Sequence, residues 1–187
     1  MRRLAFVLIA SVAAACSSPP PDLYTLAAQP GPVVHGTARS VELRRFGLAA
    51  YLDRPEIVRS SAAYRLQVTT TERWGEPLGK MLGRVFAEDL VERMPDTAVF
   101  NETGAVSTQP DKVVAVDVQR FDADASGEVV LLAQVAVRPA DDTRPAEART
   151  LRIAARPGGK SVADQVAAMS RALAQLADTV AGILARP

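Results

Sequence analysis

The run "KVVAVDVQRFDADASGEVVLLAQVAVR", residues 112–138, decides the fold. Two apolar segments rich in valine, 112–121 and 128–138, flank a polar stretch that contains a glycine. This pattern predicts two antiparallel strands joined by a hairpin turn. A third segment of the same kind, 148–156, follows the polar connection "PADDTRPAE", which we expect to be exposed. The three segments together predict an antiparallel meander with one buried face.

Two stretches change from the strand period to the helix period. Apolar side chains recur at helical spacing over residues 78–94, and Pro77 fits the first turn, where a missing N–H costs nothing. A longer apolar stripe covers residues 162–184 and follows a capping-box pair, Ser161 and Asp164. Both stretches are therefore predicted to be amphipathic helices.

The part of the chain that precedes the first helix is rich in short strand-like segments. Three segments are predicted strands: "LYTLAA" (23–28), "SVELRRF" (40–46) and "YRLQVTT" (64–70). In the last of them, Tyr64, Leu66 and Val68 alternate along the strand and therefore lie on one side. The order strands, helix, strands, helix predicts one α+β domain over residues 23–187. We expect a mostly antiparallel sheet with the two amphipathic helices packed on one face.

The N-terminus has the anatomy of an export signal. "MRRLAFVLIASVAAAC" begins with two arginines and continues with an apolar run, residues 4–15, that ends at the only cysteine of the chain, Cys16. As a helix this run spans about 18 Å, too short for a hydrocarbon core of roughly 30 Å. It is typical of a secretory signal. The cleavage region, Ala13–Ala15 followed by Cys16, resembles the lipobox of bacterial lipoproteins, although that family usually has leucine where this chain has Ala13.

The lipobox resemblance implies that the Cys16 thiol is converted to a lipidated thioether and becomes the mature N-terminus. The alternatives are a plain signal peptide with a coincidental cysteine, or a buried cysteine in a cytosolic protein. We favour lipid attachment, which divides the chain into a signal peptide (1–15), a lipidated tether (16–22) and the folded domain (23–187). The tether "SSPPPD" is extended and reaches roughly 19 Å, so the membrane is close to the domain.

The composition excludes several functional classes. The chain has 22 basic and 21 acidic residues without a basic stripe, so we expect no nucleic-acid partner. The single histidine, His35, lies in a Pro/Gly loop and is read as solvated. The stretch "DADASG" (122–127) matches half of a calcium loop, but Ala133 stands where the pattern needs a glutamate, so it is read as a turn. No metal, cofactor or catalytic group is predicted.

One polar segment with an aromatic residue has no obvious place in the core. "AYLDRPEIVRS" (50–60) contains an Asp-Arg pair, Asp53 and Arg54, followed by Pro55. Such a pair usually stabilises a turn, and Trp74 in "RWGEPL" usually caps the neighbouring helix. Tyrosine, tryptophan and arginine are also the side chains most enriched as anchors of protein interfaces.

These stretches resemble a known family. "YLDRPEIV" (51–58) and "RWGEPLGKMLGRVFAEDL" (73–90), behind a lipobox and a "YTL" opening, are similar to the ABC-type transport auxiliary lipoproteins of the PqiC-like family. "VDVQRFD" (116–122) resembles that family's strand before the hairpin. The resemblance implies a periplasmic lipoprotein without an active site, usually at the outer membrane. It also implies an MCE-domain envelope protein as partner, in a system that moves phospholipids or other hydrophobic molecules. Ser17 after Cys16 fits outer-membrane sorting.

We therefore expect one contiguous surface that binds an MCE-domain partner or a second copy of the chain. The residues of this predicted surface are Tyr51, Leu52, Asp53, Arg54, Pro55 and Trp74. The alternative, that they brace the sheet edge against the first helix, is equally consistent with the sequence. Two other functions remain open. A stand-alone lipid carrier would contain a sizeable cavity, and a hydrolase of envelope polymers would need a cluster of titratable groups that the sequence does not contain.

Overall fold

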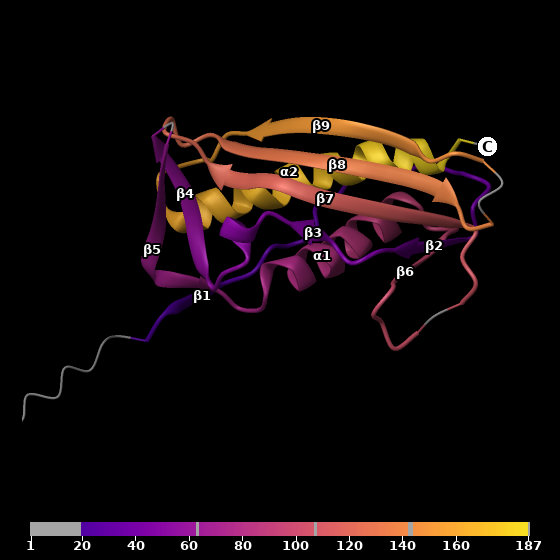
Figure 1. Cartoon of the computed structure of the whole chain (residues 1–187), viewed down its shortest axis with the longest axis horizontal. Coiled ribbons are helices and arrows are strands. Elements are labelled where there is room, and N and C mark those ends of the chain that lie inside the picture. Colours follow the sequence, from indigo (N-terminus) through magenta and orange to yellow (C-terminus); the bar gives the residue numbers. More distant parts are fainter. Residues whose placement is uncertain (1–19, 63, 107, 142–143, 187) are drawn as a thin grey trace, which may run out of the picture.

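The computed structural model describes residues 20–62, 64–106, 108–141 and 144–186. Figure 1 shows two long helices and an extended, curled sheet. In chain order the elements are β1 (Asp22–Tyr24), β2 (Ser40–Leu43), β3 (Gly47–Leu48), the 3-10 helix η1 (Ala50–Leu52), β4 (Glu56–Ala62), β5 (Arg65–Trp74), α1 (Leu78–Arg93), β6 (Ala98–Asn101), β7 (Lys112–Ala123), β8 (Val129–Pro139), β9 (Glu147–Ala155) and α2 (Val162–Leu184).

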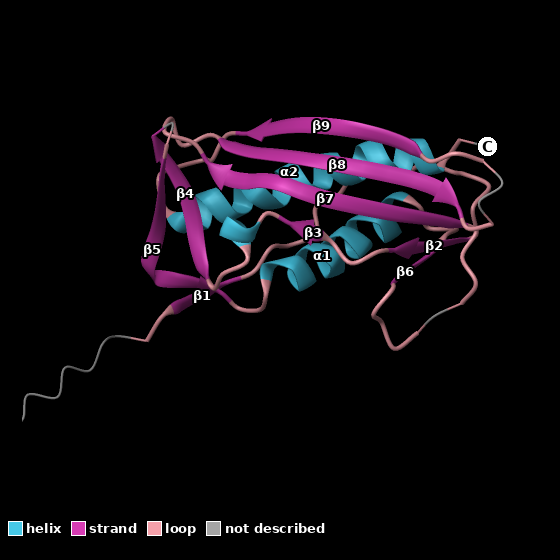
Figure 2. Ribbon diagram, viewed as in Figure 1, coloured by secondary structure: helices cyan, strands magenta, loops and turns pink. Residues whose placement is uncertain are grey.

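The long strand β7 is the centre of the sheet. One of its edges pairs antiparallel with β8 along the whole strand, and β8 pairs antiparallel with β9. These three strands form the broad upper part of the sheet in Figure 2. The meander predicted from residues 112–156 is confirmed.

The other edge of β7 is shared by three short strands that precede it in the chain. β2, β3 and β4 pair with successive parts of β7, and all three run parallel to it. β2 also pairs parallel with β6, and β1 pairs parallel with β5. The sheet is mixed, so the prediction of a mostly antiparallel sheet is wrong. Parallel neighbours need a long crossover and leave no turn signal between them, which is why the sequence pattern did not reveal them.

The segment before α1 contains a hairpin that the sequence did not predict as one unit. β4 and β5 pair antiparallel, with an irregular register between Glu56 and Val58. In Figure 1 this hairpin lies across one end of the molecule, crosswise to β7, β8 and β9. The side chains of Tyr64, Leu66 and Val68, which alternate along the predicted strand, are exposed.

Both predicted helices are present. α1 follows directly after Pro77, and Ser161 and Asp164 form the predicted capping box at the start of α2. α2 contacts β7, β8 and β9, whereas α1 contacts α2 and β6. The aromatic rings of Phe46 and Phe86 meet edge to face, with centroids 5.4 Å apart, and attach α1 to the segment after β2. None of the helices in the described ranges is both long and apolar enough to span a bilayer.

Candidate functional site

The first family-like block, residues 51–58, begins with an inward-directed tyrosine. Tyr51 lies in η1 and is half-buried, and its hydroxyl donates a hydrogen bond of 2.6 Å to Oδ2 of Asp122. Burial, followed by the hydrogen bond to Asp122, raises the pKa of Tyr51 well above its usual range. The phenol therefore stays protonated and acts as a donor to the carboxylate.

Asp122 is the common acceptor of this region and is only 1% exposed. Its Oδ1 accepts from Oγ of Ser60 at 3.0 Å and from Nε and Nη2 of Arg120 at 3.1 and 2.9 Å. A buried carboxylate needs such partners to offset the loss of hydration. The network joins η1 and β4 to β7, and its hydrogen bonds from Tyr51 and Ser60 to Asp122 span 71 and 62 residues of sequence. It supports a bracing role for Tyr51.

The rest of the first block divides into buried and exposed residues. Leu52 is buried in the core, whereas Asp53, Arg54 and Pro55 are exposed. Nε of Arg54 pairs with Oε2 of Glu56 at 3.0 Å, and this hydrogen bond lowers the pKa of Glu56. An exposed pair of this kind contributes only about 0–1 kcal/mol to stability.

Trp74 joins the second block, residues 73–78, to the first through its backbone. Its N–H donates to the carbonyl oxygen of Pro55 at 2.7 Å, while its indole ring is buried. The structure thus brings the two blocks into contact through this hydrogen bond. It places Leu52 and Trp74 inside the molecule, however, so only Asp53, Arg54 and Pro55 of the six residues are fully on the surface. Whether this surface binds a partner stays a prediction.

Next to the exposed part of the first block lies an open groove of about 970 Å³, which we call the interblock groove. It is lined by residues from the segments 43–48, 77–84 and 101–104 and by Asp53. Asp53 comes from the first block and Pro77 from the second. The groove is therefore where both blocks reach a common concave surface.

The rim of the interblock groove is rich in cations. Arg44 and Arg84 are each paired with two carboxylates at distances of 2.6–3.3 Å. Arg45 and Lys80 are exposed, and neither side chain forms an ion pair with any residue in the described ranges. The groove lining thus contains four cations and two carboxylates, Asp53 and Glu102, and the ammonium and guanidinium groups of Lys80 and Arg45 are left to pair with an acidic partner.

Glycines keep the floor of this groove free of side chains. Gly79 and Gly83 lie one helical turn apart on α1, and both line the groove. A Cβ at Gly83 would lie 3.3 Å from Oδ1 of Asn101, closer than most real contacts. A glycine inside a helix costs roughly 1 kcal/mol relative to alanine. The close approach of α1 to Asn101, the last residue of β6, accounts for Gly83. The glycine pair at i, i+4 is the sequence signal that could have pointed to this groove.

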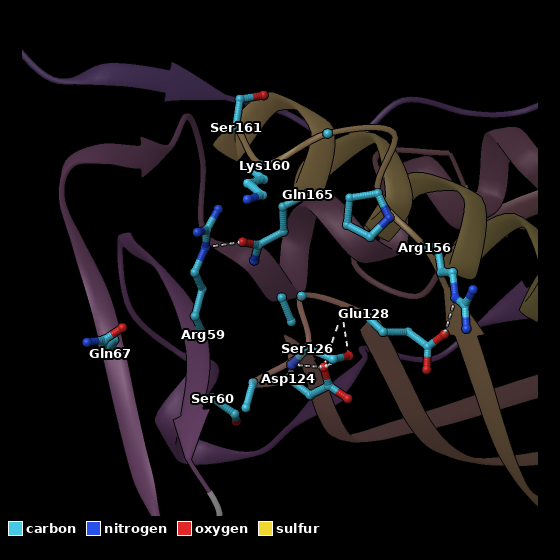
Figure 3. Close-up of a pocket in the computed structure, with 15 residues that line it drawn as sticks. Arg59, Ser60, Gln67, Asp124, Ser126, Glu128, Arg156, Lys160, Ser161 and Gln165 are labelled. Atoms are coloured by element: carbon cyan, nitrogen blue, oxygen red, sulfur yellow. Dashed lines mark hydrogen bonds and ion pairs between the residues drawn. The ribbon is translucent and has the colours of Figure 1, made fainter.

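A second, polar pocket of about 720 Å³ lies between the β4–β5 hairpin, the β7–β8 turn and the start of α2 (Figure 3). Most of its charged side chains have a hydrogen-bond or ion-pair partner within the pocket. Nε of Arg59 donates to Oε1 of Gln165, and Arg156 pairs with Glu128 at 3.3 Å. The pocket thus links neighbouring elements through polar contacts.

The turn "DADASG" forms one wall of this pocket. Oδ1 of Asp124 accepts from the backbone N–H groups of Ser126 and Glu128, at 2.8 and 3.1 Å, and from the Ser126 hydroxyl, and these bonds lower its pKa. Gly127 has a φ of +87°, a conformation that favours glycine. The prediction of a hairpin turn here is confirmed.

Other candidate groups are few in the part of the chain that the structure describes. Nδ1 of His35 lies 2.8 Å from Oδ2 of Asp96, and both side chains are exposed. The described ranges contain no group of three or more His, Cys, Asp or Glu side chains positioned to hold a metal ion. Cys16 and the predicted signal peptide (1–15) lie outside the described residues.

The fold is shared with solved structures. One is a crystal structure of an uncharacterised protein, with a TM-score of 0.75 and 14% sequence identity, covering 88% of this chain and 99% of the other. Another is the protein XCC0632 from Xanthomonas campestris, with a TM-score of 0.72 and 21% identity, covering 87% of this chain and 94% of the other. At these identities the likeness concerns the fold alone. No curated protein matches the sequence significantly.

The sequence itself matches a family model. The matching model is that of the ABC-type transport auxiliary lipoprotein component, and the match covers residues 24–181. This range includes both blocks, all of α1, α2 as far as Ala181, and every described strand except the first two residues of β1. The chain therefore belongs to the family of ABC-type transport auxiliary lipoprotein components.

Proposed function

We propose that this lipoprotein is a non-enzymatic subunit of an MCE-type system that moves phospholipids or other hydrophobic molecules between the envelope membranes and supports envelope integrity. The lipid on Cys16 holds it at the outer membrane, and the domain faces the periplasm. The family supports the broad class, an auxiliary component of an ABC-type transporter. The lipobox-like sequence supports the anchor.

The observation that carries the proposal is the convergence of both blocks on the interblock groove. Asp53 and Pro77 meet there beside two cations, Arg45 and Lys80, that have no ion-pair partner among the described residues. Unpaired charges around a concave surface favour a complementary partner and steer its approach. The partner that fits is an acidic segment of an MCE-domain envelope protein, seated between the two blocks.

The test is purification of the full-length lipoprotein from detergent-solubilised membranes under mild conditions, with identification of what accompanies it. The proposal expects an MCE-domain protein in the complex. The variant Cys16→Ser, which cannot be lipidated, is expected to leave the membrane fraction and lose most of this complex. A lone monomer that carries stoichiometric phospholipid, without an MCE protein, would instead favour the stand-alone lipid carrier.

A further inference from the structure

An apolar stripe lies along the β1–β5 edge of the sheet. Leu23 on β1, Tyr64 just before β5, and Leu66 and Val68 on β5 are exposed, Tyr64 completely (103%) and Leu66 by 48%. The remaining exposed large apolar side chains of the described ranges are single residues elsewhere: Val33, Val91 and Val106. Scattered apolar side chains on a surface are ordinary, but a row along one edge marks a contact surface.

The backbone of this edge is also open. β1 pairs only with residues 72–74 of β5. In the described ranges β4 pairs with one edge of β5, and no strand pairs with the other edge over residues 66–71. An open edge presents unpaired N–H and C=O groups. Water, lipid headgroups or another strand can satisfy these groups, whereas hydrocarbon cannot.

The position of the lipid anchor selects among these occupants. Asp22, the first residue of β1, lies opposite Glu72 of β5. Cys16 precedes Asp22 by six residues, a distance of at most about 20 Å for an extended chain. Leu66 precedes Glu72 by the same number of residues, roughly 20 Å along a strand. A bilayer that holds the lipid on Cys16 is therefore within reach of the whole stripe.

We propose that the stripe formed by Leu23, Tyr64, Leu66 and Val68 is the face that the domain lays on the lipid surface. The inference rests on the proposed lipid anchor at Cys16. Insertion is confined to the headgroup region, because the open edge of β5 keeps its hydrogen bonds there and the Tyr64 hydroxyl stays hydrated. The contact is weak on its own, but the short tether gives it a high effective concentration at the membrane.

This contact fixes the orientation of the molecule. β5 runs crosswise to the long strands β7, β8 and β9 in Figure 1, at the end of the molecule opposite the C-terminus. With β5 flat on the bilayer, the long strands stand upright. The end that carries β6 and the C-terminus then points away from the membrane.

The depth of the stripe in the bilayer can be measured with a single label on the chain. Lipidation consumes the thiol of its only cysteine, so an introduced cysteine is the sole free thiol of the mature protein. We would label Leu66→Cys, and separately Val68→Cys, with an environment-sensitive fluorophore in the full lipidated chain. The matched control is Val91→Cys, since Val91 has nearly the same exposure (47%). It lies in the last turn of α1. Figure 1 shows that this helix rises away from β5 toward β2 and β6.

The labelled proteins are placed in vesicles of phosphatidylethanolamine and phosphatidylglycerol at low protein density. Quenching is measured with doxyl lipids and with aqueous iodide. We expect doxyl quenching at positions 66 and 68 to exceed that at 91 by about twofold or more, as for a shallow interfacial contact. Doxyl quenching no greater than at position 91 overturns the inference, and so does protection from both quenchers, which indicates a protein contact. Flotation of the vesicles is scored separately. Protein that floats without quenching refutes this inference alone, whereas protein that does not float refutes the anchor and the inference together.

Discussion

The hydroxyl of Tyr51 donates to the buried carboxylate of Asp122 at 2.6 Å, across 71 residues of sequence. Asp122 accepts at the same time from Ser60 and Arg120. The first residue of the first block thus supports a buried acceptor, while Asp53, one of the block's exposed residues, lines the interblock groove. The residue that braces the fold is therefore different from the residue that we propose to contact a partner.

The first prediction separates these two roles. Tyr51→Phe keeps the ring but removes one donor to a buried charged acceptor, so the free energy of unfolding should fall by about 1.5–3 kcal/mol. Arg54→Ala removes only an exposed pair with Glu56, and its effect should stay within about 1 kcal/mol. Urea unfolding of both variants measures the difference. Equal losses for the two variants would show that Tyr51 does not brace the fold.

The second prediction concerns a buried carboxyl on α1. Asp89 is fully buried, and its Oδ1 accepts from the N–H of Gln29 at 2.8 Å, whereas its Oδ2 has no hydrogen-bond partner in the described part of the chain. The guanidinium of Arg93 lies 3.6 Å from Oδ1 and also binds Asp178. Burial raises the pKa of Asp89 to about 6, since the attraction of Arg93 and the Gln29 bond do not offset the loss of hydration.

The direction in which the free energy of unfolding changes with pH follows from proton binding at Asp89. Between pH 4 and pH 6 the unfolded chain loses this proton while the folded chain keeps it, so the contribution of Asp89 to stability is lost as the pH rises. The loss is about 3 kcal/mol for a shift of this size. Because asparagine does not titrate, the free energy of unfolding of the wild type should fall by up to that amount relative to Asp89→Asn between pH 4 and pH 7. A difference that stays constant with pH would mean that Asp89 ionises normally in the folded protein.

The third prediction addresses the charge of the interblock groove. Arg45→Glu and Lys80→Glu alter exposed side chains, so each should change stability by less than about 0.5 kcal/mol. Each should reduce recovery of the MCE-domain partner by roughly tenfold, because like charges across an interface repel. The matched control is Arg152→Glu, which reverses the charge of an exposed residue on β9 and should leave recovery of the partner unchanged. Equal recovery of the partner with all three variants would show that the groove is not part of the interface.

Local patterns were sufficient for part of this fold. The alternation of residues 112–138 with a turn at Asp124 predicted the β7–β8 hairpin, and Ser161 with Asp164 predicted the start of α2. These signals lie within a few residues of one another. The pairing of β2, β3 and β4 with β7 depends on contacts between distant segments. The residues of a short strand do not indicate which other strand it pairs with.

The same limit applies to the site. The two blocks could be recognised from their residues, and their meeting at Pro55 and Trp74 was expected. The burial of Leu52 and Trp74 depends on how η1 and β5 pack, which composition does not show. Arg45 and Lys80 lie outside both blocks, and only the fold brings them beside Asp53.

The most direct test of docking by this lipoprotein is photo-crosslinking in living cells from a reactive amino acid at position 80, in the interblock groove. The matched control is the same amino acid in place of Ala148, an exposed residue on β9. The account predicts a covalent adduct with an MCE-domain envelope protein from position 80 and none from position 148. Absence of this adduct at position 80, with the protein correctly lipidated and folded, would contradict it.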